Sequence, residues 1–304
     1  MDGLLVIDKP QGCTSHDIVL RIRRLFGTRR VGHGGTLDPD ATGVLLVALG
    51  QATRFFPFLS GHDKTYEGRI RLGLATDSYD AAGRPASEEW TGDFPDDTAV
   101  ASAMKSFEGE ILQVPPSYSA KKLGGKPAYR LARAGRDFVL EPVRITVRLF
   151  ALKNYAPPFL DFEAACSAGT YIRSLAHDLG LKLGCGGHLR SLRRTSSGPY
   201  AVGAAFPLAE IEKAAAEGRA DQLVIPLERL LPGAPAVVLS PEAGPRVANG
   251  SPLLRIHLAD FSAGPAAGSG EAAVIRVFDS RGKLLALARP SAGGEALLPF
   301  LVLK

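Results

Sequence analysis

The chain has 304 residues, of which 45% are hydrophobic and 22% are charged, and its formal net charge is +5. This composition is ordinary for a globular protein with a real core, in one large or two unequal domains, and the weak positive charge fits an anionic partner. Three widely spaced cysteines form no disulfide framework or metal pair, and the sequence has neither a signal-like N-terminus nor an apolar run of roughly 18 residues, which predicts a cytoplasmic protein without membrane spans.

The first predicted elements are a buried strand and an amphipathic helix. The apolar residues 4–7, which end before Pro10, are typical of a buried strand. The helix is expected over 15–26, because Thr14 and Asp17 have the spacing of a capping box and the apolar residues after them fall on one face.

Residues 32–43 follow, with four glycines within twelve residues. Because each glycine loses backbone entropy on folding, this density predicts a shaped loop rather than a helix or a strand. We expect the loop to hold His33 and Asp38 at an open surface, directly after the basic pair Arg29 and Arg30. An Asp-Pro pair is most often a simple turn. Here the carboxylate beside cations indicates chemistry on a polyanion, with Asp38 as nucleophile or base.

Alternating and helical patterns continue through the middle of the chain. They predict half-buried strands at 64–74, 145–149 and 162–166, a short helix near 100–107 and a longer helix over 171–183.

Several side chains on these elements have both a structural and a functional interpretation. Tyr66, close to Lys64 at the start of a strand, is either a core tyrosine or a ring on which a base stacks. Arg173 lies on the first turn of a helix that otherwise faces inward, so it needs an acidic partner if it is buried. Asp38 is a candidate, and the pair would favour the ionised form of its carboxyl; a surface ion pair or a phosphate contact is the alternative. His33 is either a satisfied polar residue or a phosphate or base contact, and no second His or Cys lies at metal-ligand spacing.

Charge is segregated along the chain. Residues 117–148 hold eight Lys/Arg against two acids, whereas residues 86–113 hold seven acids against one lysine. The part between 118 and 130 mixes cations, glycines and aromatics, which suits either a solvated loop or an arm that grips a phosphate backbone. A further basic cluster near Leu192 consists of Arg190, Arg193 and Arg194.

The composition changes again toward the C-terminus. A linker is expected at 232–235, and short strand-like pieces follow at 237–239, 274–278 and 284–288. An Ala/Gly-rich stretch at 262–270 splits these pieces and is typical of a flexible loop.

Five separated blocks lie at residues 3–17, 32–43, 64–66, 113–121 and 169–176. Together they resemble the TruB family of tRNA pseudouridine synthases over nearly all of residues 3–232. The resemblance implies a pseudouridine synthase fold of the mixed α/β (α+β) class over 1–232, with a long, mostly antiparallel sheet flanked by helices. It also implies an RNA-gripping thumb segment at 117–148 and a small PUA-like β-barrel domain at 236–304.

The resemblance further implies an activity, the isomerisation of uridine to pseudouridine at position 55 in the T loop of tRNA, by a monomer that uses no cofactor or metal. Asp38 is the implied catalytic carboxylate and acts on a flipped-out uridine, Arg173 pairs with Asp38, and Tyr66 stacks on the flipped base and assists proton transfer. His33 is implied to contact displaced nucleotides, and Leu192 to line an apolar pocket. The other implied substrate contacts are Lys9, Gly35, Thr36, Lys64, Lys121, Lys122, Lys126 and Arg130.

Three other functions compete with this interpretation. A non-catalytic tRNA-binding or tRNA-folding protein would use the same cationic arm without needing Asp38. A guide-RNA-dependent pseudouridylase subunit would share the fold, but the sequence lacks the long basic tails typical of that class, and the thumb-like segment favours a stand-alone enzyme. A two-carboxylate glycosidase needs a second acid near Asp38, and the sequence shows no evident one.

Overall fold

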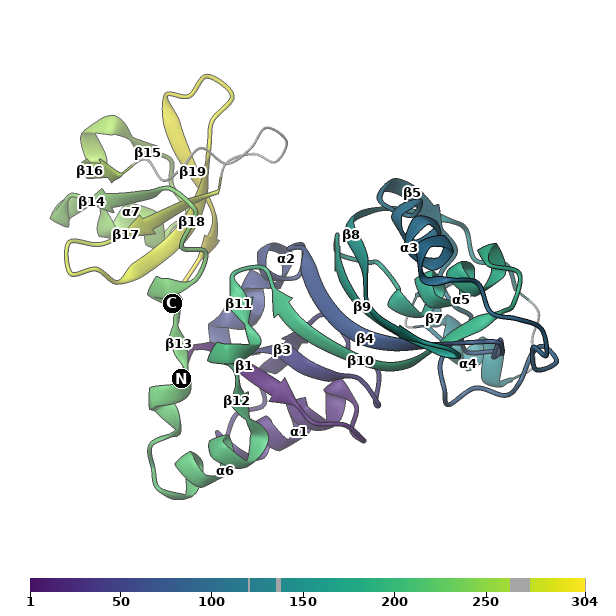
Figure 1. Ribbon diagram of the computed structural model, residues 1–304. Helices are drawn as coiled ribbons and strands as arrows, with labels where there is room; N and C mark the ends of the chain where they lie inside the picture. The colour runs from purple at the N-terminus through teal and green to yellow at the C-terminus, as the bar shows by residue number, and fades with distance from the viewer. Residues whose placement is uncertain (120, 135–137, 263–273, 304) are drawn as a thin grey trace.

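The computed structural model describes residues 1–119, 121–134, 138–262 and 274–303 of the chain. These residues form a large curved sheet flanked by helices and a small β-barrel in the C-terminal part (Figure 1). Of the Ala/Gly-rich stretch predicted at 262–270, residues 263–270 lie outside the described residues. Within the described ranges, none of the helices combines the length and the apolar character that crossing a bilayer requires.

The large sheet has eleven strands and is mostly antiparallel, as predicted. Its order is β12-β1-β3-β10-β4-β9-β8-β5, with β2, β11 and β13 paired at its margins, and only the β1–β12 and β3–β10 pairs are parallel. The strands are β1 (Gly3–Lys9), β2 (Val31–Gly34), β3 (Thr42–Leu49), β4 (Lys64–Leu72), β5 (Gly109–Gln113), β8 (Val143–Ala156), β9 (Phe159–Cys166), β10 (Gly187–Ser197), β11 (Tyr200–Ala201), β12 (Phe206–Pro207) and β13 (Ile225–Pro226).

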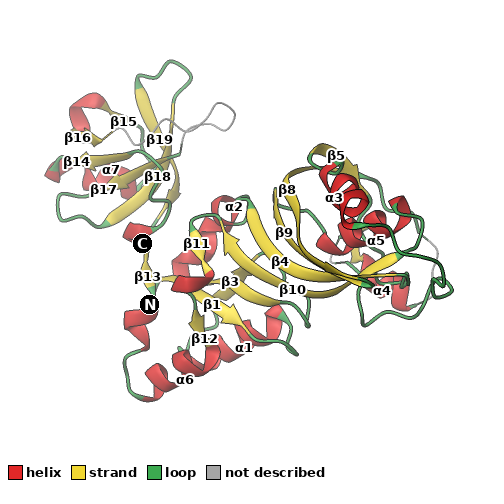
Figure 2. Ribbon diagram, viewed as in Figure 1, coloured by secondary structure: helices red, strands yellow, loops and turns green. Residues whose placement is uncertain are grey.

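Helices cover the sheet at both of its ends (Figure 2). They are α1 (Ser15–Leu25), α2 (Phe56–Leu59), α3 (Asp97–Lys105), α4 (Ala128–Arg133), α5 (Ile172–Lys182) and α6 (Leu208–Ala216). The predicted capping box of α1 is present, because the Thr14 and Asp17 side chains each accept a hydrogen bond from the backbone N–H of the other residue. Helices α3 and α5 pack on β4, β8 and β9 around one core, and α1 and α6 pack on β1 and β3 around another.

The strands β1 and β3 are buried on both faces, which explains why they are apolar without alternation. Leu5, Leu45 and Val47 face α1, whereas Leu4 and Leu46 face the segment that ends in α2. The small barrel packs on this second face through Leu284, Leu287 and Leu301, three apolar residues of its strands.

The glycine-rich stretch departs from its prediction as a single loop. Residues Gly32 to Gly34 form most of strand β2, which pairs with β3, and only residues 35–41 form a loop. The physical reason is the ring of Phe56, which packs so closely that a Cβ at Gly32 or Gly34 would lie 2.9 or 3.1 Å from it. At these two positions glycine therefore makes room for an aromatic ring and does not break the strand.

The strand predicted at 145–149 is the start of the longer β8, and its alternation is interrupted by a β-bulge. The pairing with β9 shifts between Val147 and Leu149. The extra residue moves Leu149 to a half-buried position and turns Phe150 into the core, where it is 1% exposed. Residues 143–148, included in the predicted thumb segment, thus lie in the large sheet.

In the residues that the structure describes, the small barrel contains six strands in the order β15-β19-β18-β17-β14-β16. Its elements are β14 (Ala236–Leu239), α7 (Gly244–Ala248), β15 (Leu253–Leu254), β16 (Leu258–Ser262), β17 (Ile275–Phe278), β18 (Leu284–Pro290) and β19 (Ala296–Val302). The sequence patterns predicted β14, β17 and β18 and missed β15, β16 and β19. A separate two-stranded hairpin, β6 (Lys122–Leu123) and β7 (Lys126–Pro127), precedes α4.

Candidate active site

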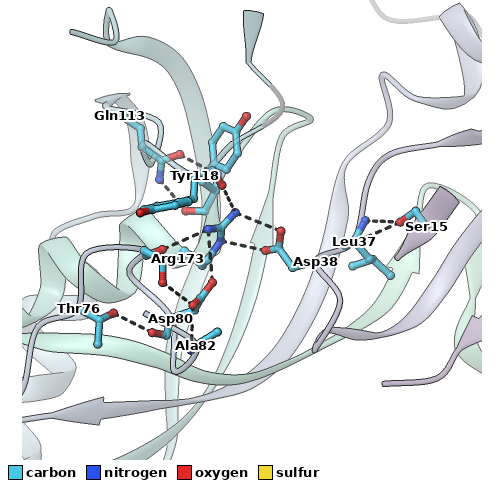
Figure 3. A network of polar contacts seen from close by, with 11 residues as sticks. Ser15, Leu37, Asp38, Thr76, Asp80, Ala82, Gln113, Tyr118 and Arg173 are labelled. Atoms are coloured by element: carbon cyan, nitrogen blue, oxygen red, sulfur yellow. Dashed lines mark hydrogen bonds and ion pairs between the residues drawn. The ribbon is translucent and has the colours of Figure 1, made fainter. Parts of the chain in front are cut away.

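The loop at 35–41 holds Asp38 in place, because the residues before and after it are hydrogen-bonded to side chains outside the loop. On one side the Ser15 hydroxyl, at the start of α1, accepts a hydrogen bond from Leu37 N at 2.9 Å and donates one to Leu37 O at 3.1 Å (Figure 3). On the other side Lys9 Nζ donates to Pro39 O at 3.0 Å. The backbone around the carboxylate is therefore fixed by two buried polar side chains.

Lys9 is fully buried, at 0% exposure, and its ammonium group donates three hydrogen bonds to carbonyl oxygens. The other two acceptors are Pro10 O at 2.9 Å and Cys13 O at 2.7 Å, in the turn that follows β1. Burial is the main cause of a lowered pKa for Lys9. This placement favours a positioning role for Lys9 over the substrate contact implied for it at the level of sequence.

Arg173 reaches Asp38 from the first turn of α5. Its Nε lies 2.9 Å from Asp38 Oδ2 and its Nη2 donates to Asp38 Oδ1 at 3.1 Å, so the ion pair is bidentate. The start of α5 is itself anchored, because the Gln113 side chain pairs with both the N–H and the carbonyl of Tyr171. The structure thus brings together the two residues that the sequence predicted as partners, and it buries the arginine, whose side chain is 7% exposed.

The rest of the guanidinium group is also occupied. Nη2 donates to Tyr118 O at 3.0 Å, and Nη1 donates to Ser78 O at 3.1 Å and lies 3.4 Å from Asp80 Oδ2. Figure 3 shows Arg173 lying between Asp38 and Asp80. Asp80 is therefore a second acid close to Asp38, which the sequence analysis did not predict. The only feature of the sequence that could have indicated it is the cluster of Asp, Ser and Thr at 76–80.

Burial is the main influence on Asp38 and raises the pKa of its carboxyl above the ordinary value of 3.8. The charge of Arg173 opposes this rise, Asp80 adds to it, and Lys9 opposes it weakly. The sequence predicted that the arginine would favour the ionised form, and it does so, but desolvation outweighs it. The carboxylate is nevertheless open to solvent, with 40% of its side chain exposed.

Tyr66 lies on β4 with 7% exposure, and burial is the main cause of its raised pKa. Its cross-strand neighbour Arg194, on β10, is 1% exposed and donates to Val44 O at 2.6 Å and to Gly35 O at 3.1 Å. Gly43, at φ +98°, allows this approach, since a Cβ there would lie 2.2 Å from Arg194 O. Arg194 thus ties both ends of the Asp38 loop to β10.

The sequence had indicated a basic cluster that included Arg194. In the structure Arg194 is buried, so it does not share a basic surface with Arg190 and Arg193. Its neighbour Arg193 is half-buried and forms an ion pair with Asp8 at 2.7 Å. Only Arg190 of the three remains exposed, at the rim of the cavity described below.

The other predicted residues of this region lie around the same loop. His33, half-buried on β2, has its pKa lowered by burial and then by Arg194, so it is neutral at pH 7. Lys64 is 5% exposed and donates to Ser60 O and His62 O, each at 2.6 Å, and burial, with the charge of Arg194, lowers its pKa to about 8. Gly35 has φ +94°, and Thr36 beside it is exposed.

An open cavity of about 510 Å³ lies beside the carboxylate, within the range of small-ligand sites. Asp38, Arg173, Leu192 and Tyr118 are among its lining residues. It continues into a groove of about 840 Å³, with Leu192 between the two. Within the part of the chain that the structure describes, no group of three or more His, Cys, Asp or Glu side chains is arranged to hold a metal ion.

The part of the chain between 118 and 130, called the basic segment below, lies near this cavity, since Tyr118 and Tyr129 line it. Lys121, Lys126 and Arg130 are exposed, on and beside the β6–β7 hairpin and α4. The backbone of Lys122 belongs to β6, and its side chain lies outside what the structure describes.

Known proteins resemble this chain in both sequence and fold. Residues 23–172 match the TruB family pseudouridylate synthase (N terminal domain), and residues 173–232 match the tRNA pseudouridylate synthase B C-terminal domain. A protein of Solibacter usitatus named tRNA pseudouridine synthase B is 41% identical over 98% of this chain and 97% of its own length. One of the same name from Syntrophotalea carbinolica is 45% identical over 86% of this chain and 84% of its own length.

Among solved structures, the chain is similar to one in "Structure of H/ACA RNP bound to a substrate RNA containing 2'-deoxyuridine", with a TM-score of 0.74 and 27% identity, over 99% of this chain and 85% of that one. It is also similar to a chain in "Crystal Structure of a Cbf5-Nop10-Gar1 Complex", with a TM-score of 0.74 and 28% identity, over 99% of this chain and 84% of that one.

Proposed function

The chain belongs to the TruB family of pseudouridylate synthases, and from this premise we propose that Asp38 catalyses the isomerisation of a flipped-out uridine in the T loop of tRNA, at position 55. The activity, uridine to pseudouridine in tRNA, is an intramolecular transfer, and its tRNA substrate fits a cytoplasmic location. The single observation that carries the assignment of Asp38 is its bidentate ion pair with the buried Arg173 beside an open cavity.

The chemistry suits one positioned carboxylate. The reaction breaks the N-glycosidic bond of uridine and rejoins the same base through carbon 5, so it consumes no electrons. It requires the nucleoside to leave the base stack, because the reacting atoms are otherwise covered. Asp38 reaches the cavity with 40% of its side chain exposed, while Arg173 holds both of its oxygens and sets the direction of the carboxylate.

Burial raises the pKa of Asp38, and this has a catalytic consequence. A carboxylate with a raised pKa is a stronger base and nucleophile than an ordinary surface aspartate, because less solvent stabilises its charge. Arg173 opposes this rise, because its positive charge stabilises the ionised form of the carboxyl. The pair therefore holds a partly desolvated carboxyl group at the point of reaction.

The surrounding residues divide between substrate contact and support. Leu192 lines the cavity, and Thr36 is exposed in the same loop as Asp38, so we assign them, with Gly35, to the uridine and its neighbours. We assign His33, which is neutral, to displaced bases rather than to phosphates. The ring of Tyr66 is almost fully buried, so stacking on the base requires the cavity to open toward it when RNA binds.

We assign the phosphate contacts to the basic segment. Its exposed cations Lys121, Lys126 and Arg130 are close in sequence to Tyr118 and Tyr129, which line the cavity, and Lys122 belongs to the same hairpin. Such contacts supply affinity that does not depend on base identity. We retain the thumb without residues 143–148, which belong to β8 of the large sheet. The division into a catalytic domain at 1–232 and a PUA-like domain at 236–304, and the monomeric state, are also parts of this proposal.

A guide-RNA-dependent subunit is the second candidate, because the similar solved structures include an H/ACA RNP. The relatives named tRNA pseudouridine synthase B are more similar in sequence, at 41–45% identity against 27–28%. This difference favours an enzyme that acts on tRNA alone.

The decisive experiment uses purified full-length protein and an unmodified tRNA transcript carrying tritium at uridine carbon 5. We expect tritium release without any guide RNA, and none from a transcript with cytidine at position 55. Asp38→Asn should abolish release while it still binds the transcript, whereas Asp97→Asn, a matched change of an exposed acid on α3, should have no effect. Release by Asp38→Asn at the wild-type rate would refute the assignment of Asp38, and release only after a guide RNA is added would refute the stand-alone enzyme.

A further inference from the structure

Tyr79 has a backbone conformation that a tyrosine seldom adopts. Its φ is +64°, in the left-handed region, which is strained for any residue other than glycine because of the Cβ atom. It lies in the turn at 76–80, between Ser78 and Asp80, which both contact Arg173. A glycine would adopt this conformation without strain, so the tyrosine side chain has to contribute something that the backbone does not require.

The turn is tightly determined by its own hydrogen bonds. The Thr76 hydroxyl donates to Asp80 O at 2.7 Å, a contact drawn in Figure 3, and the Ser78 hydroxyl donates to Asp80 Oδ1 at 2.6 Å. The turn also docks on β10, where Leu189 N donates to Tyr79 O at 2.9 Å. A shift of Tyr79 would therefore move Ser78 O and the Asp80 carboxylate together.

The Tyr79 ring lies face to face with the ring of His177. Their centroids are 3.8 Å apart and their planes differ by 9°, and both side chains are half-buried. Burial lowers the pKa of His177, so at pH 7 two neutral rings are stacked. The contact shields one face of each ring from water, and this is what the tyrosine side chain adds at a position where glycine would suit the backbone better.

His177 follows Arg173 by four residues on α5, so the two side chains lie on the same face of the helix, about one turn apart. The turn at 76–80 is consequently attached to α5 at two points, by the polar contacts to Arg173 and by the ring pair. Ser78 O and Asp80 Oδ2 face Nη1 of Arg173, and this leaves Nε and Nη2 directed at Asp38.

We propose that Tyr79 and His177 are positioning residues: their ring stack holds the turn at 76–80 against Arg173 and so fixes the guanidinium plane that orients Asp38. The expected effect on kcat rests on the proposed function. The effect on the Arg173–Asp38 pair does not, since the geometry of the pair can be measured without turnover. Neither ring is among the residues that line the cavity, so the stack acts through Arg173.

The test compares Tyr79→Gly, which suits the backbone but removes the ring, with Tyr79→Phe, which keeps the ring. Tyr79→Gly should lower kcat about tenfold at unchanged affinity for tRNA, because small displacements of an orienting group lower turnover more than binding. Tyr79→Phe should stay within about twofold of the wild type. His177→Ala should behave like Tyr79→Gly, and the double variant should be no slower than either single one, as expected for a coupled pair.

A second measurement separates this proposal from the proposed function. The pKa of Asp38, followed by carboxyl NMR on labelled protein, should rise further in Tyr79→Gly and stay at the wild-type value in Tyr79→Phe, since a looser Arg173 opposes the effect of burial less. If Tyr79→Gly lowers Tm but leaves the Asp38 pKa and kcat unchanged, the stack is merely structural and the proposal is wrong. If the wild type releases no tritium yet the pKa shifts as described, only the proposed function fails.

Discussion

The cations beside Asp38 and those of the basic segment have opposite surroundings. Lys9, Lys64, Arg173 and Arg194 are 0%, 5%, 6% and 1% exposed, and each donates hydrogen bonds to backbone carbonyls; Arg173 also binds carboxylates. The cations of the basic segment, Lys121, Lys126 and Arg130, are exposed to solvent. Residues of the same charge thus serve two purposes within a short distance of one cavity.

The difference teaches that charge alone does not identify an RNA contact. Burying a cation costs free energy unless its donors are satisfied, so the four buried cations are held by backbone carbonyls and, in Arg173, also by the carboxylates of Asp38 and Asp80. Removing one leaves carbonyls without donors. Removing an exposed cation changes mainly the long-range attraction to phosphates, which salt screens.

Of the variants that test this comparison, Arg173→Lys is expected to have the largest effect, on kcat. An ammonium cannot hold both oxygens of Asp38 in one plane, so we expect kcat to fall about 100-fold while tRNA affinity changes by less than about twofold. Single-turnover kinetics and filter binding measure the two quantities. Equal losses in both would identify Arg173 as a phosphate contact instead.

Lys9→Met should mainly lower stability. Three carbonyl oxygens lose their donor, so we expect the free energy of unfolding to fall by about 2 kcal/mol, with affinity for tRNA unchanged. Urea denaturation and tRNA binding test this, with Lys126→Met on the exposed hairpin as the matched control, which should weaken binding and leave stability unchanged. The opposite pattern would restore Lys9 as a substrate contact.

The triple variant Lys121→Gln/Lys126→Gln/Arg130→Gln should act on affinity alone. Loss of three phosphate contacts is expected to weaken binding about tenfold and to reduce the slope of log K against log salt by about 2. The value of kcat at saturating tRNA should not change. Lys213→Gln, an exposed change on α6, serves as the control, and an unaltered salt slope in the triple variant would contradict the role of the segment.

The smallest effect concerns Asp178, an acid on the same helix as Arg173 whose pKa burial raises to about 6. Because its pKa is raised in the folded state, its contribution to stability is fully present below its ordinary pKa and is lost as the pH rises through about 6. Asp178→Asn should therefore raise the free energy of unfolding at pH 7.5 by about 1 kcal/mol and have little effect at pH 4.

Urea denaturation at the two pH values measures the difference between Asp178→Asn and the wild type. Asp93→Asn, at an exposed position, is the matched control and should change stability equally little at both. A gain of the same size at both pH values would show that packing, and not the buried charge, is responsible.

Features that depend on neighbours along the chain could be predicted from the sequence alone. The capping box of α1 and the alternation of β4 follow from local periodicity, because side-chain direction repeats with the geometry of the backbone. Arg173 was also predictable as a residue in need of an acid, since it begins a helix whose other first-turn residues face the core.

Only the tertiary structure determined which charged side chains are buried. The buried state of Arg194 depends on carbonyls of Gly35 and Val44, about 150 residues away in sequence, and the contact of Asp80 with Arg173 depends on how a turn docks on β10. Likewise, Gly32 and Gly34 form a strand because the Phe56 ring covers them. Local sequence patterns do not predict such partners. The desolvation and the hydrogen bonds of a buried side chain depend on segments that are distant in sequence and that only the fold brings next to it.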